Sequence, residues 1–415
     1  MRRTIWESIA GMLDSRPPLP LRFRLWNKVA HYLRADRLRF ASLDEEHLHK
    51  AAMKETGLTY FGDPYYREGL LTLIESARKD ANLHVLGRAM MHGSIVVYLS
   101  NRLLLAEARN QTPEVFQRPL IPPIIIVGLP RSGTTLLHRM LALDPAHRGV
   151  PYWELARPLP TGTPDRRREL ADKGDRFWQQ LHPGRDRIHY SRIDEPEECI
   201  ILQGTTFYSG QFFALAPLYS YFDWYLAQDH LKAYQEYRQL LQVLQAVDPE
   251  RRLTLKAPAH TTFLPILLHT IPDALIVQTH RDPVPVCSST CSMIYSLWGM
   301  TTASIDVPRM AEMWISLMEK QAATGLTFRE TNPGVIYDVY YDRFVADPIG
   351  TVRGLYDHFG LTWPDGHEEK LEAYVSENPQ NKHGVHRYSP EDFGLTNDAI
   401  AGRFTEYRRR FGFAD

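Results

Sequence analysis

The sequence predicts an α/β fold in which a parallel sheet is flanked by helices, and two observations lead to this prediction. From residue 121 onward, short runs rich in β-branched residues alternate with long helical patterns, which is typical of a parallel sheet with helical crossovers. Polar side chains also follow each run, and ligands of such folds bind at the carboxyl ends of the strands. The predicted strands are Ile124–Val127, Leu253–Lys256, Ala274–His280 and Val335–Tyr340.

Residues 1–120 read as a helical N-terminal subdomain or cap, with apolar residues near helical spacing from Tyr66 to Asn110. Residues 1–40 mix apolar side chains with arginines, a pattern that allows weak contact with a membrane surface. Pro17, Pro18 and Pro20 interrupt this segment. They favour an arm packed on the protein's own surface.

The composition excludes several classes of protein. The chain has 415 residues, of which 44% are hydrophobic and 23% charged, and its net charge is −1. Proteins that mainly bind nucleic acid are strongly basic, so nucleic acid is not expected as a partner. Three cysteines suggest no disulfide framework and fit a cytoplasmic location. No run of eighteen apolar residues occurs, so no transmembrane helix is expected.

The stretch from Pro123 to Leu143, PIIIVGLPRSGTTLLHRMLAL, carries the strongest functional signal. A buried strand leads into a glycine-bounded loop, Gly128–Gly133, and Thr134 and Thr135 then open an amphipathic helix. Backbone N–H groups and the positive end of the helix dipole converge at such a loop. We therefore expect an anion site rather than a plain turn, on a P-loop-like parallel sheet.

The loop departs from that of the nucleoside-triphosphate enzymes. Its spacing is theirs, GxxxxG followed by two residues, but Thr134 stands where they carry lysine. Arg131 is the only cation inside the loop. Backbone N–H groups, hydroxyls and a guanidinium suit a diphosphate-like anion better than β- and γ-phosphates with a metal. A P-loop kinase or NTPase is therefore the alternative, and not the first, interpretation.

Two later strands end in residues that can carry chemistry. Lys256 ends the second predicted strand, and His260 follows at the start of the next helix as a candidate general base. The third predicted strand ends in HRDP, and Ser289 follows eight residues after Arg281. A guanidinium and a hydroxyl can together hold a phosphate monoester.

These motifs together resemble a known family. The PRSGTT loop is similar to the 5′-phosphosulfate loop of sulfotransferases that use 3′-phosphoadenosine 5′-phosphosulfate (PAPS), in the form found in the tyrosylprotein sulfotransferases and a large bacterial branch. HRDP with Ser289 looks like the family's 3′-phosphate site, YYDRF with the ADPIGTVRGLYDHFGL after it like the stretch after its fourth strand, and KHGVHRYSPEDFGL like the bacterial tail motif. The resemblance covers about residues 121–395. It implies a sulfotransferase-like domain over residues 121–415 and an enzyme that transfers a sulfuryl group from PAPS.

The resemblance also implies roles for individual residues. Arg131 and Lys256 would stabilise charge on the leaving phosphate, and no metal should be required. Two candidates for the base stay open: Glu154 in PYWEL, by similarity to the tyrosylprotein enzymes, and His260, by similarity to the cytosolic enzymes. The acidic run of Asp194, Glu195, Glu197 and Glu198 reads as a solvated helix start, and contacts of these residues with the acceptor stay open. The residues expected to contact the donor are Arg131, Ser132, Gly133, Thr134, Thr135, Arg281, Ser289, Tyr341, Lys382 and Arg387.

Residues 150–250 form an insertion between the first strand–helix unit and the second strand. Its aromatic side chains predict a helical packing layer, an acceptor pocket, or both. The acceptor is then expected to be a sizeable apolar or aromatic small molecule or a lipid with a hydroxyl or an amine, while a saccharide or peptide stays open. The rings are those of Phe207, Tyr208, Phe212, Phe213, Tyr219, Tyr221, Phe222, Trp224 and Tyr225.

Overall fold

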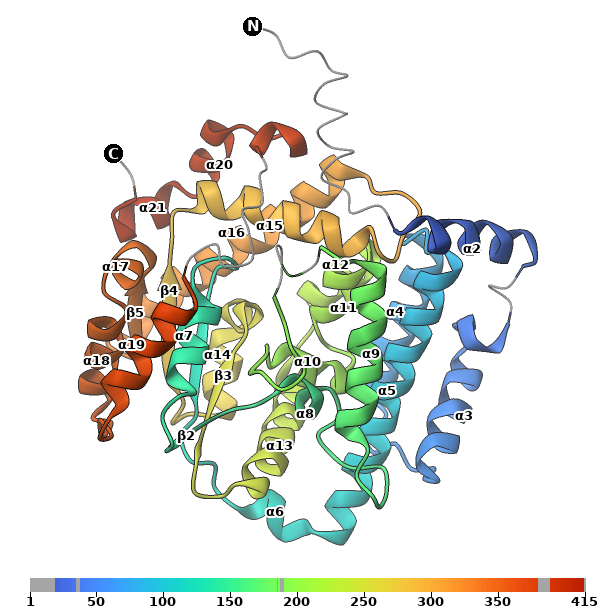
Figure 1. Ribbon diagram of the computed structural model, residues 1–415, viewed down its shortest axis with the longest axis horizontal. Coiled ribbons are helices and arrows are strands. Elements are labelled where there is room, and N and C mark those ends of the chain that lie inside the picture. The colour runs from blue at the N-terminus through green and yellow to red at the C-terminus, as the bar shows by residue number, and fades with distance from the viewer. Residues whose placement is uncertain (1–18, 35–37, 185, 187–189, 380–388, 414–415) are drawn as a thin grey trace, which may run out of the picture.

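A five-stranded parallel sheet lies at the centre of the molecule (Figure 1). The computed structural model describes residues 19–34, 38–184, 186, 190–379 and 389–413. The strand order is β2-β3-β1-β4-β5, and every neighbouring pair runs parallel, which confirms the predicted fold class. The strands are β1 (Ile124–Gly128), β2 (His147–Gly149), β3 (Arg252–Lys256), β4 (Leu275–His280) and β5 (Ile336–Tyr340).

All four predicted strands are present, and the prediction omits only β2 among the strands of the described residues. This strand has three residues, and only its pairing with β3, where His147 lies beside Arg252, identifies it. A run of His, Arg and Gly has no apolar pattern that predicts a strand. Its position at the edge of the sheet nevertheless extends the carboxyl edge.

Helices cover both faces of the sheet. The helices after β1 are α7 (Thr134–Leu141), α8 (Tyr152–Ala156), α9 (Arg167–Leu181), α10 (Ile200–Gln203), α11 (Gln211–Leu215), α12 (Tyr219–Ala227), α13 (Leu231–Val247), α14 (Leu264–Thr270), α15 (Pro283–Trp298), α16 (Val307–Thr331), α17 (Tyr341–Ala346), α18 (Pro348–Phe359), α19 (His367–Glu377), α20 (Asn397–Arg403) and α21 (Thr405–Phe411). Short 3₁₀ segments lie at η4 (Gly204–Thr206), η5 (Pro258–Phe263) and η6 (Pro390–Phe393).

Successive side chains of each strand face different helix layers, because side chains alternate along a strand. Ile124 and Ile126 face the core formed with α7, α18 and α19. Ile125 and Leu255 face the larger core formed with α13, α14, α16 and the insertion. The β1–α7 connection therefore crosses the carboxyl edge of the sheet onto the first of these faces.

The described part of the N-terminal region contains helices and a short 3₁₀ segment. The region from Tyr66 to Asn110 is helical as predicted and consists of two helices, since the chain turns at Asn82, whose φ is 42°. Both helices share the large core with the insertion, so the division at residue 120 stays a prediction. The elements are α2 (Leu21–Tyr32), η2 (Arg39–Ala41), α3 (Glu45–Thr56), α4 (Tyr66–Lys79), α5 (Val85–Gln111) and α6 (Pro113–Gln117).

The aromatic side chains of the insertion pack mainly on one another. Phe207 stacks on Phe212 with ring centroids 5.8 Å apart, and Phe213 meets Tyr225 edge to face at 5.4 Å. Eight of the nine rings named above are buried, and Trp224 is half-buried. The interpretation as a packing layer is thus confirmed, whereas the role of these rings in binding an acceptor stays a prediction.

Candidate active site

The loop between β1 and α7 has an unusual backbone. Gly128, Arg131 and Gly133 have φ values of 126°, 63° and 90°. Glycine is required at position 128, because a Cβ there would lie 2.4 Å from the carbonyl oxygen of Thr279. Arg131 adopts a left-handed conformation that non-glycine residues rarely hold, and such strain concentrates at functional sites. The turn aims the first N–H groups of α7, which have no partner within the helix, toward the loop.

Ser132 holds the loop in place. Its side chain is fully buried, and its Oγ donates to the carbonyl of Leu129 and lies 2.6 Å from Oγ1 of Thr279 on β4. Both contacts are internal to the protein. The Ser132 hydroxyl thus anchors the loop to the sheet, and its main chain remains the part that can face a ligand. Thr134 is buried and Thr135 half-buried at the start of α7.

Four of the predicted donor contacts meet beside this loop. Nε of Arg131 donates to Oγ of Ser289 on α15 over 3.2 Å. Arg281, just after β4, donates to the carbonyl oxygen of Arg131 over 2.9 Å, and its guanidinium lies 4.1 Å from the ring centroid of Tyr341. The ring of Tyr341 in turn closes on the loop, since a Cβ on Gly133 would lie 3.0 Å from it. Residues from the loop after β1, from the turn after β4 and from helices α15 and α17 therefore converge at one edge.

Lys256 lies at the same edge, beside β1. It pairs in register with Ile126, two residues before the loop. Its side chain is only 1% exposed, and Nζ lies 2.7 Å from Oε1 of Glu198 and 3.8 Å from Oε1 of Glu197. A buried ammonium needs such partners, because removal from water without them carries a large free-energy cost.

The sequence did not predict that these glutamates pack against Lys256. The prediction treats the acidic run as solvated, yet Glu197 is buried. The N–H of Glu197 donates to Val150 and that of Cys199 to Lys256, over 3.2 and 3.0 Å, so the run extends the sheet edge. The sequence offers one signal, since apolar residues follow the glutamates directly in CIIL.

His260 lies behind the edge in an aromatic pocket. It is fully buried, with Nδ1 2.9 Å from the hydroxyl of Tyr234 and Nε2 3.3 Å from Sγ of Cys199. Burial lowers the pKa of His260 to about 3. Both ring nitrogens are engaged and the ring is a weak base, so this environment disfavours His260 as the proton acceptor.

Glu154 is also buried, on the face of the sheet opposite the Lys256 side chain. Its Oε2 accepts from Arg148 over 2.6 Å, and Arg148 also donates to the carbonyl of Leu244 on α13 over 3.0 Å. The register of β2 places Arg148 beside Leu253, whose side chain faces the α13 layer, whereas Lys256 faces the α7 layer. Oε1 of Glu154 has no hydrogen-bond partner within the described residues, so one carboxylate oxygen is open to a further contact.

The donor set fits a ligand with two anionic groups. Arg131, Arg281 and Ser289 supply N–H and O–H groups, and the start of α7 supplies backbone N–H groups and a positive dipole end. Lys382 and Arg387, predicted as further phosphate contacts, lie outside the described residues.

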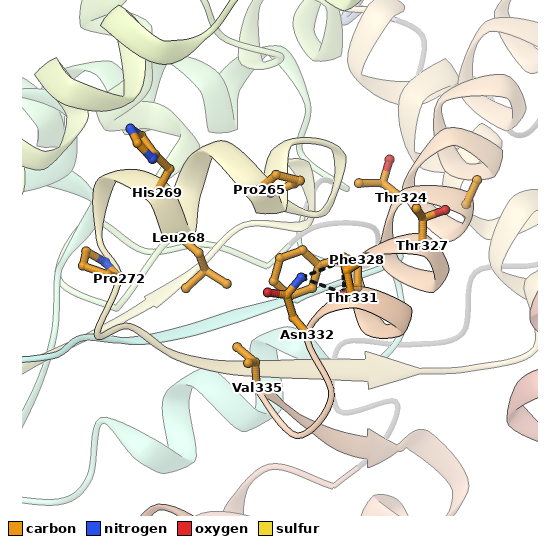
Figure 2. A pocket seen from close by; sticks show the side chains of 11 residues that line it. Pro265, Leu268, His269, Pro272, Thr324, Thr327, Phe328, Thr331, Asn332 and Val335 are labelled. Atoms are coloured by element: carbon orange, nitrogen blue, oxygen red, sulfur yellow. Dashed lines mark hydrogen bonds between the residues drawn. The ribbon is translucent and has the colours of Figure 1, made fainter.

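A separate surface pocket of about 680 Å³ lies away from this edge (Figure 2). Figure 2 shows side chains from α14, from α16 and from the turns that precede β4 and β5 around it. These turns lie at the amino edge of the sheet, opposite the loop. Its lining includes Leu268, Phe328 and Val335 and lacks the arginines described above. We therefore do not assign the reaction to this pocket.

The fold and the site together define a P-loop-like α/β protein with an anion-binding loop at the carboxyl edge of its sheet. The chain belongs to the sulfotransferase family, because residues 122–365, more than half of the chain, match the sequence profile of that family. It is thus an enzyme that transfers a sulfuryl group. The similarity of its loop to the tyrosylprotein enzymes in particular stays a prediction.

Several mycobacterial sulfotransferases are similar to this chain. It is 27% identical over 294 residues to omega-hydroxy-beta-dihydromenaquinone-9 sulfotransferase Stf3 of Mycobacterium bovis. The aligned residues cover 67% of this chain and 72% of the relative. The crystal structure of sulfotransferase STF1 from Mycobacterium tuberculosis superposes with a TM-score of 0.76 at 32% identity, over 88% of this chain and 98% of that one. The crystal structure of sulfotransferase STF9 from Mycobacterium avium superposes with a TM-score of 0.80 at 25% identity, over 89% of this chain and 97% of that one.

Proposed function

We propose that the enzyme transfers the sulfuryl group of PAPS to a hydroxyl of an apolar small molecule or lipid. The observation that carries the proposal is the convergence of Arg131, Arg281, Ser289 and Tyr341 at the loop. The name of Stf3 identifies a hydroxylated menaquinone as that relative's substrate, and it supports an acceptor of the same chemical class here. An amine acceptor stays open.

The two arginines suit the two anionic ends of the donor. Arg281 and Ser289 would hold the 3′-phosphate, since a guanidinium and a hydroxyl offer several N–H and O–H donors to one monoester. Arg131 and the N–H groups at the start of α7 would hold the 5′-phosphosulfate. When bound, PAPS supplies an activated sulfuryl group whose leaving group is a nucleotide phosphate. Tyr341 stacks on Arg281 and fixes the direction of its guanidinium.

Lys256 would stabilise negative charge that develops on the leaving phosphate. It is fixed by Glu198 and Glu197, and an ammonium has three N–H donors, so a third partner can be accommodated. Preorganised charge in a buried site is worth more than in water, because little water reorients during the reaction. We propose that Lys256 and the two arginines stabilise this charge directly, without a metal ion.

We propose Glu198 as the group that accepts the acceptor's proton. Its side chain is 29% exposed, so a hydroxyl can approach it, and it lies 2.7 Å from Lys256. A general base must reach the proton that it removes. Glu154 is the second candidate, because its Oε1 has no partner in the described part of the chain. His260 is the least supported, because it is buried and both of its ring nitrogens are engaged.

The other partners and the location are proposed on narrower grounds. Glu197 and Glu198 belong to the insertion and precede its aromatic side chains in the chain, so we propose that the insertion supplies the apolar surface for the acceptor. The three cysteines are unbridged and buried, which fits a reducing cytoplasmic location. Among the residues that the structure describes, no helix has the length and apolar character needed to cross a membrane.

Calorimetric titration with 3′-phosphoadenosine 5′-phosphate tests the donor assignment. We expect metal-independent binding that Arg281→Ala weakens at least tenfold, because a charged hydrogen-bond partner is lost. Arg176→Ala, on an exposed ion pair with Asp172, is the matched control and should bind as the wild type does. Binding of ATP with magnesium, without binding of the 3′-phosphate nucleotide, would contradict the assignment. A positive result justifies an acceptor screen that starts with ω-hydroxylated isoprenoid quinones.

A further inference from the structure

Helix α2 presents its apolar side to solvent. Leu21, Leu25, Val29 and Tyr32 are 62%, 53%, 57% and 86% exposed. At helical spacing these residues lie on one face, because positions three and four apart are neighbours. Trp26 and the residues just after the helix add to the same surface. We call this the α2 apolar face, formed by Leu21, Leu25, Trp26, Val29, Tyr32 and Leu33.

The opposite side of α2 holds it to the protein. Phe23 meets Phe177 of α9 edge to face at 6.3 Å, and the side-chain oxygen of Asn27 accepts from the N–H of Leu86 over 3.1 Å. Ala30 is buried against Val85. Within residues 19–34 of the predicted arm, packing on the protein's own surface is therefore present, but α2 packs through its smaller apolar side. A surface helix normally buries its larger apolar side against the protein, so the exposed apolar side of α2 indicates a binding partner.

The charge around the face identifies the kind of partner. Arg22, Arg24, Lys28 and Arg34 are exposed, and no aspartate or glutamate occurs from residue 19 to residue 34. A second copy of the chain would bring the same positive charges against these, which opposes pairing of two α2 helices. A cationic helix with Trp and Leu on its exposed face is typical of helices that lie in the interface of an anionic bilayer.

The location of α2 suits that role. Figure 1 shows α2 and α15 at the same end of the molecule, the upper end in this view. Contacts link them, since α2 packs on α9 through Phe177, and His182, just after α9, bonds to Ser296 of α15 over 2.8 Å. Helix α15 also carries Ser289 of the active site. An anchored α2 thus places the carboxyl-edge end of the molecule toward the membrane.

We propose that the α2 apolar face docks the enzyme on anionic membranes, with the arginines and lysine at the headgroups. An apolar acceptor dissolved in the bilayer is then presented to the active site, and only this last step rests on the proposed function. Docking itself depends on the exposure and charge of α2 alone.

Flotation of the full chain with phosphatidylglycerol-containing vesicles, compared with pure phosphatidylcholine vesicles, tests the proposal. We expect binding to the anionic vesicles that weakens with salt, because screening removes the headgroup attraction. Leu25→Glu with Val29→Glu should weaken it about a hundredfold, since each apolar side chain removed is worth tenfold or more. Leu71→Glu with Val247→Glu, which are 44% and 59% exposed elsewhere, is the matched control and should bind as the wild type does.

Each remaining outcome overturns the proposal or part of it. The proposal is overturned if the wild type does not bind anionic vesicles. It is also overturned if sedimentation shows a dimer that the Leu25→Glu, Val29→Glu variant no longer forms. Equal binding of Arg24→Glu with Lys28→Glu would overturn the role of charge. Binding of 3′-phosphoadenosine 5′-phosphate in the Leu25→Glu, Val29→Glu variant reports the donor site separately, so failure of docking is distinguishable from failure of the proposed function.

Discussion

Arg131 and Ser289, 158 positions apart in the chain, are joined by a hydrogen bond of 3.2 Å from Nε to Oγ. The bond connects the loop after β1 with the helix after β4, so it links the two proposed anion sites, with Arg131 in one and Ser289 in the other. Because Arg281 also donates to the carbonyl of Arg131, a ligand that engages either arginine also fixes the other. We expect binding of the two anionic groups to be coupled.

The Ser289 hydroxyl is expected to contribute directly to donor binding. Ser289→Ala should weaken binding of 3′-phosphoadenosine 5′-phosphate about tenfold, because a hydrogen bond to a charged group is worth roughly 1.5–3 kcal/mol. Its neighbour Ser288 is also buried, and its Oγ has no hydrogen-bond partner among the described residues. Ser288→Ala should therefore bind normally in calorimetry. Equal losses in both variants would show that the helix, and not the hydroxyl, is responsible.

Replacement of Lys256 should affect turnover more than binding. Lys256→Met keeps the length of the side chain and removes the charge that we assign to the leaving phosphate. We expect the turnover number to fall about 10²- to 10³-fold, the usual loss when a preorganised electrostatic contact is removed. The nucleotide product should bind within a few-fold of the wild type. A variant that keeps normal turnover would exclude this role, provided that its unfolding midpoint is unchanged.

The three candidates for the base separate in a single set of variants. Glu198→Gln should lower turnover about 10²- to 10⁴-fold with donor binding intact, since general-base catalysis contributes about that much. Glu154→Gln and His260→Gln should keep most of their turnover per folded molecule. If Glu154→Gln is the inactive variant instead, Oε1 of Glu154 is the proton acceptor. The measurement is initial rates with labelled donor at saturating acceptor.

Buried histidines should make the fold sensitive to acid. Burial lowers the pKa of His84, His138 and His230 to about 4 and that of His260 to about 3, from an ordinary value of 6.5. The unfolded chain takes up protons first as the pH falls, so stability is full above pH 6.5 and decreases toward pH 4. Each histidine contributes about 1.4 kcal/mol per pH unit below 6.5. Urea unfolding between pH 7 and 5 measures the slope.

A matched pair of variants isolates one of these histidines. His230→Gln should reduce the slope by about one proton, because the glutamine does not titrate. Val247→Ala, at an exposed position of α13, exchanges no titratable group and should leave the slope unchanged. A slope of zero in the wild type would show that the histidines are protonated without unfolding.

The sequence predicted that the candidate-site residues that follow a strand in the chain lie at one edge of the sheet. Arg131, Lys256, Arg281 and Tyr341 each come at or just after a strand, and parallel strands end at one edge, so topology alone brings them together. Their detailed partners depend on packing. Glu198 reaches Lys256 across 58 positions, and nothing in the local pattern of the acidic run indicates that pairing.

The environment of His260 could not be predicted for the same reason. Its partners, Tyr234 and Cys199, lie 26 and 61 positions earlier, in the insertion, so burial of the imidazole appears only after the layers assemble. The outward apolar face of α2 is a similar case. Helical spacing predicts an apolar face, but not which side of the helix meets the protein.

A buried ion pair should hold the N-terminal helices to the insertion. Arg102 on α5 donates to Glu236 on α13 over 2.6 Å, and their side chains are 1% and 6% exposed. Arg102→Met should lower the free energy of unfolding by about 3 kcal/mol, because it leaves a buried carboxylate with fewer partners. Lys50→Met, in an exposed pair with Glu46, should change it by less than about 0.5 kcal/mol.

The double variant Arg102→Met with Glu236→Leu should recover part of the loss, since no buried carboxylate remains, while Arg109 and the Tyr65 hydroxyl lose Glu236 as a partner. Urea unfolding followed by circular dichroism measures all of these variants. A loss in Arg102→Met no larger than that in Lys50→Met would mean that the shared aromatic core alone fastens α5 to α13. The same loss in the double variant would mean that packing of the Arg102 side chain, rather than its charge, is what stabilises the contact.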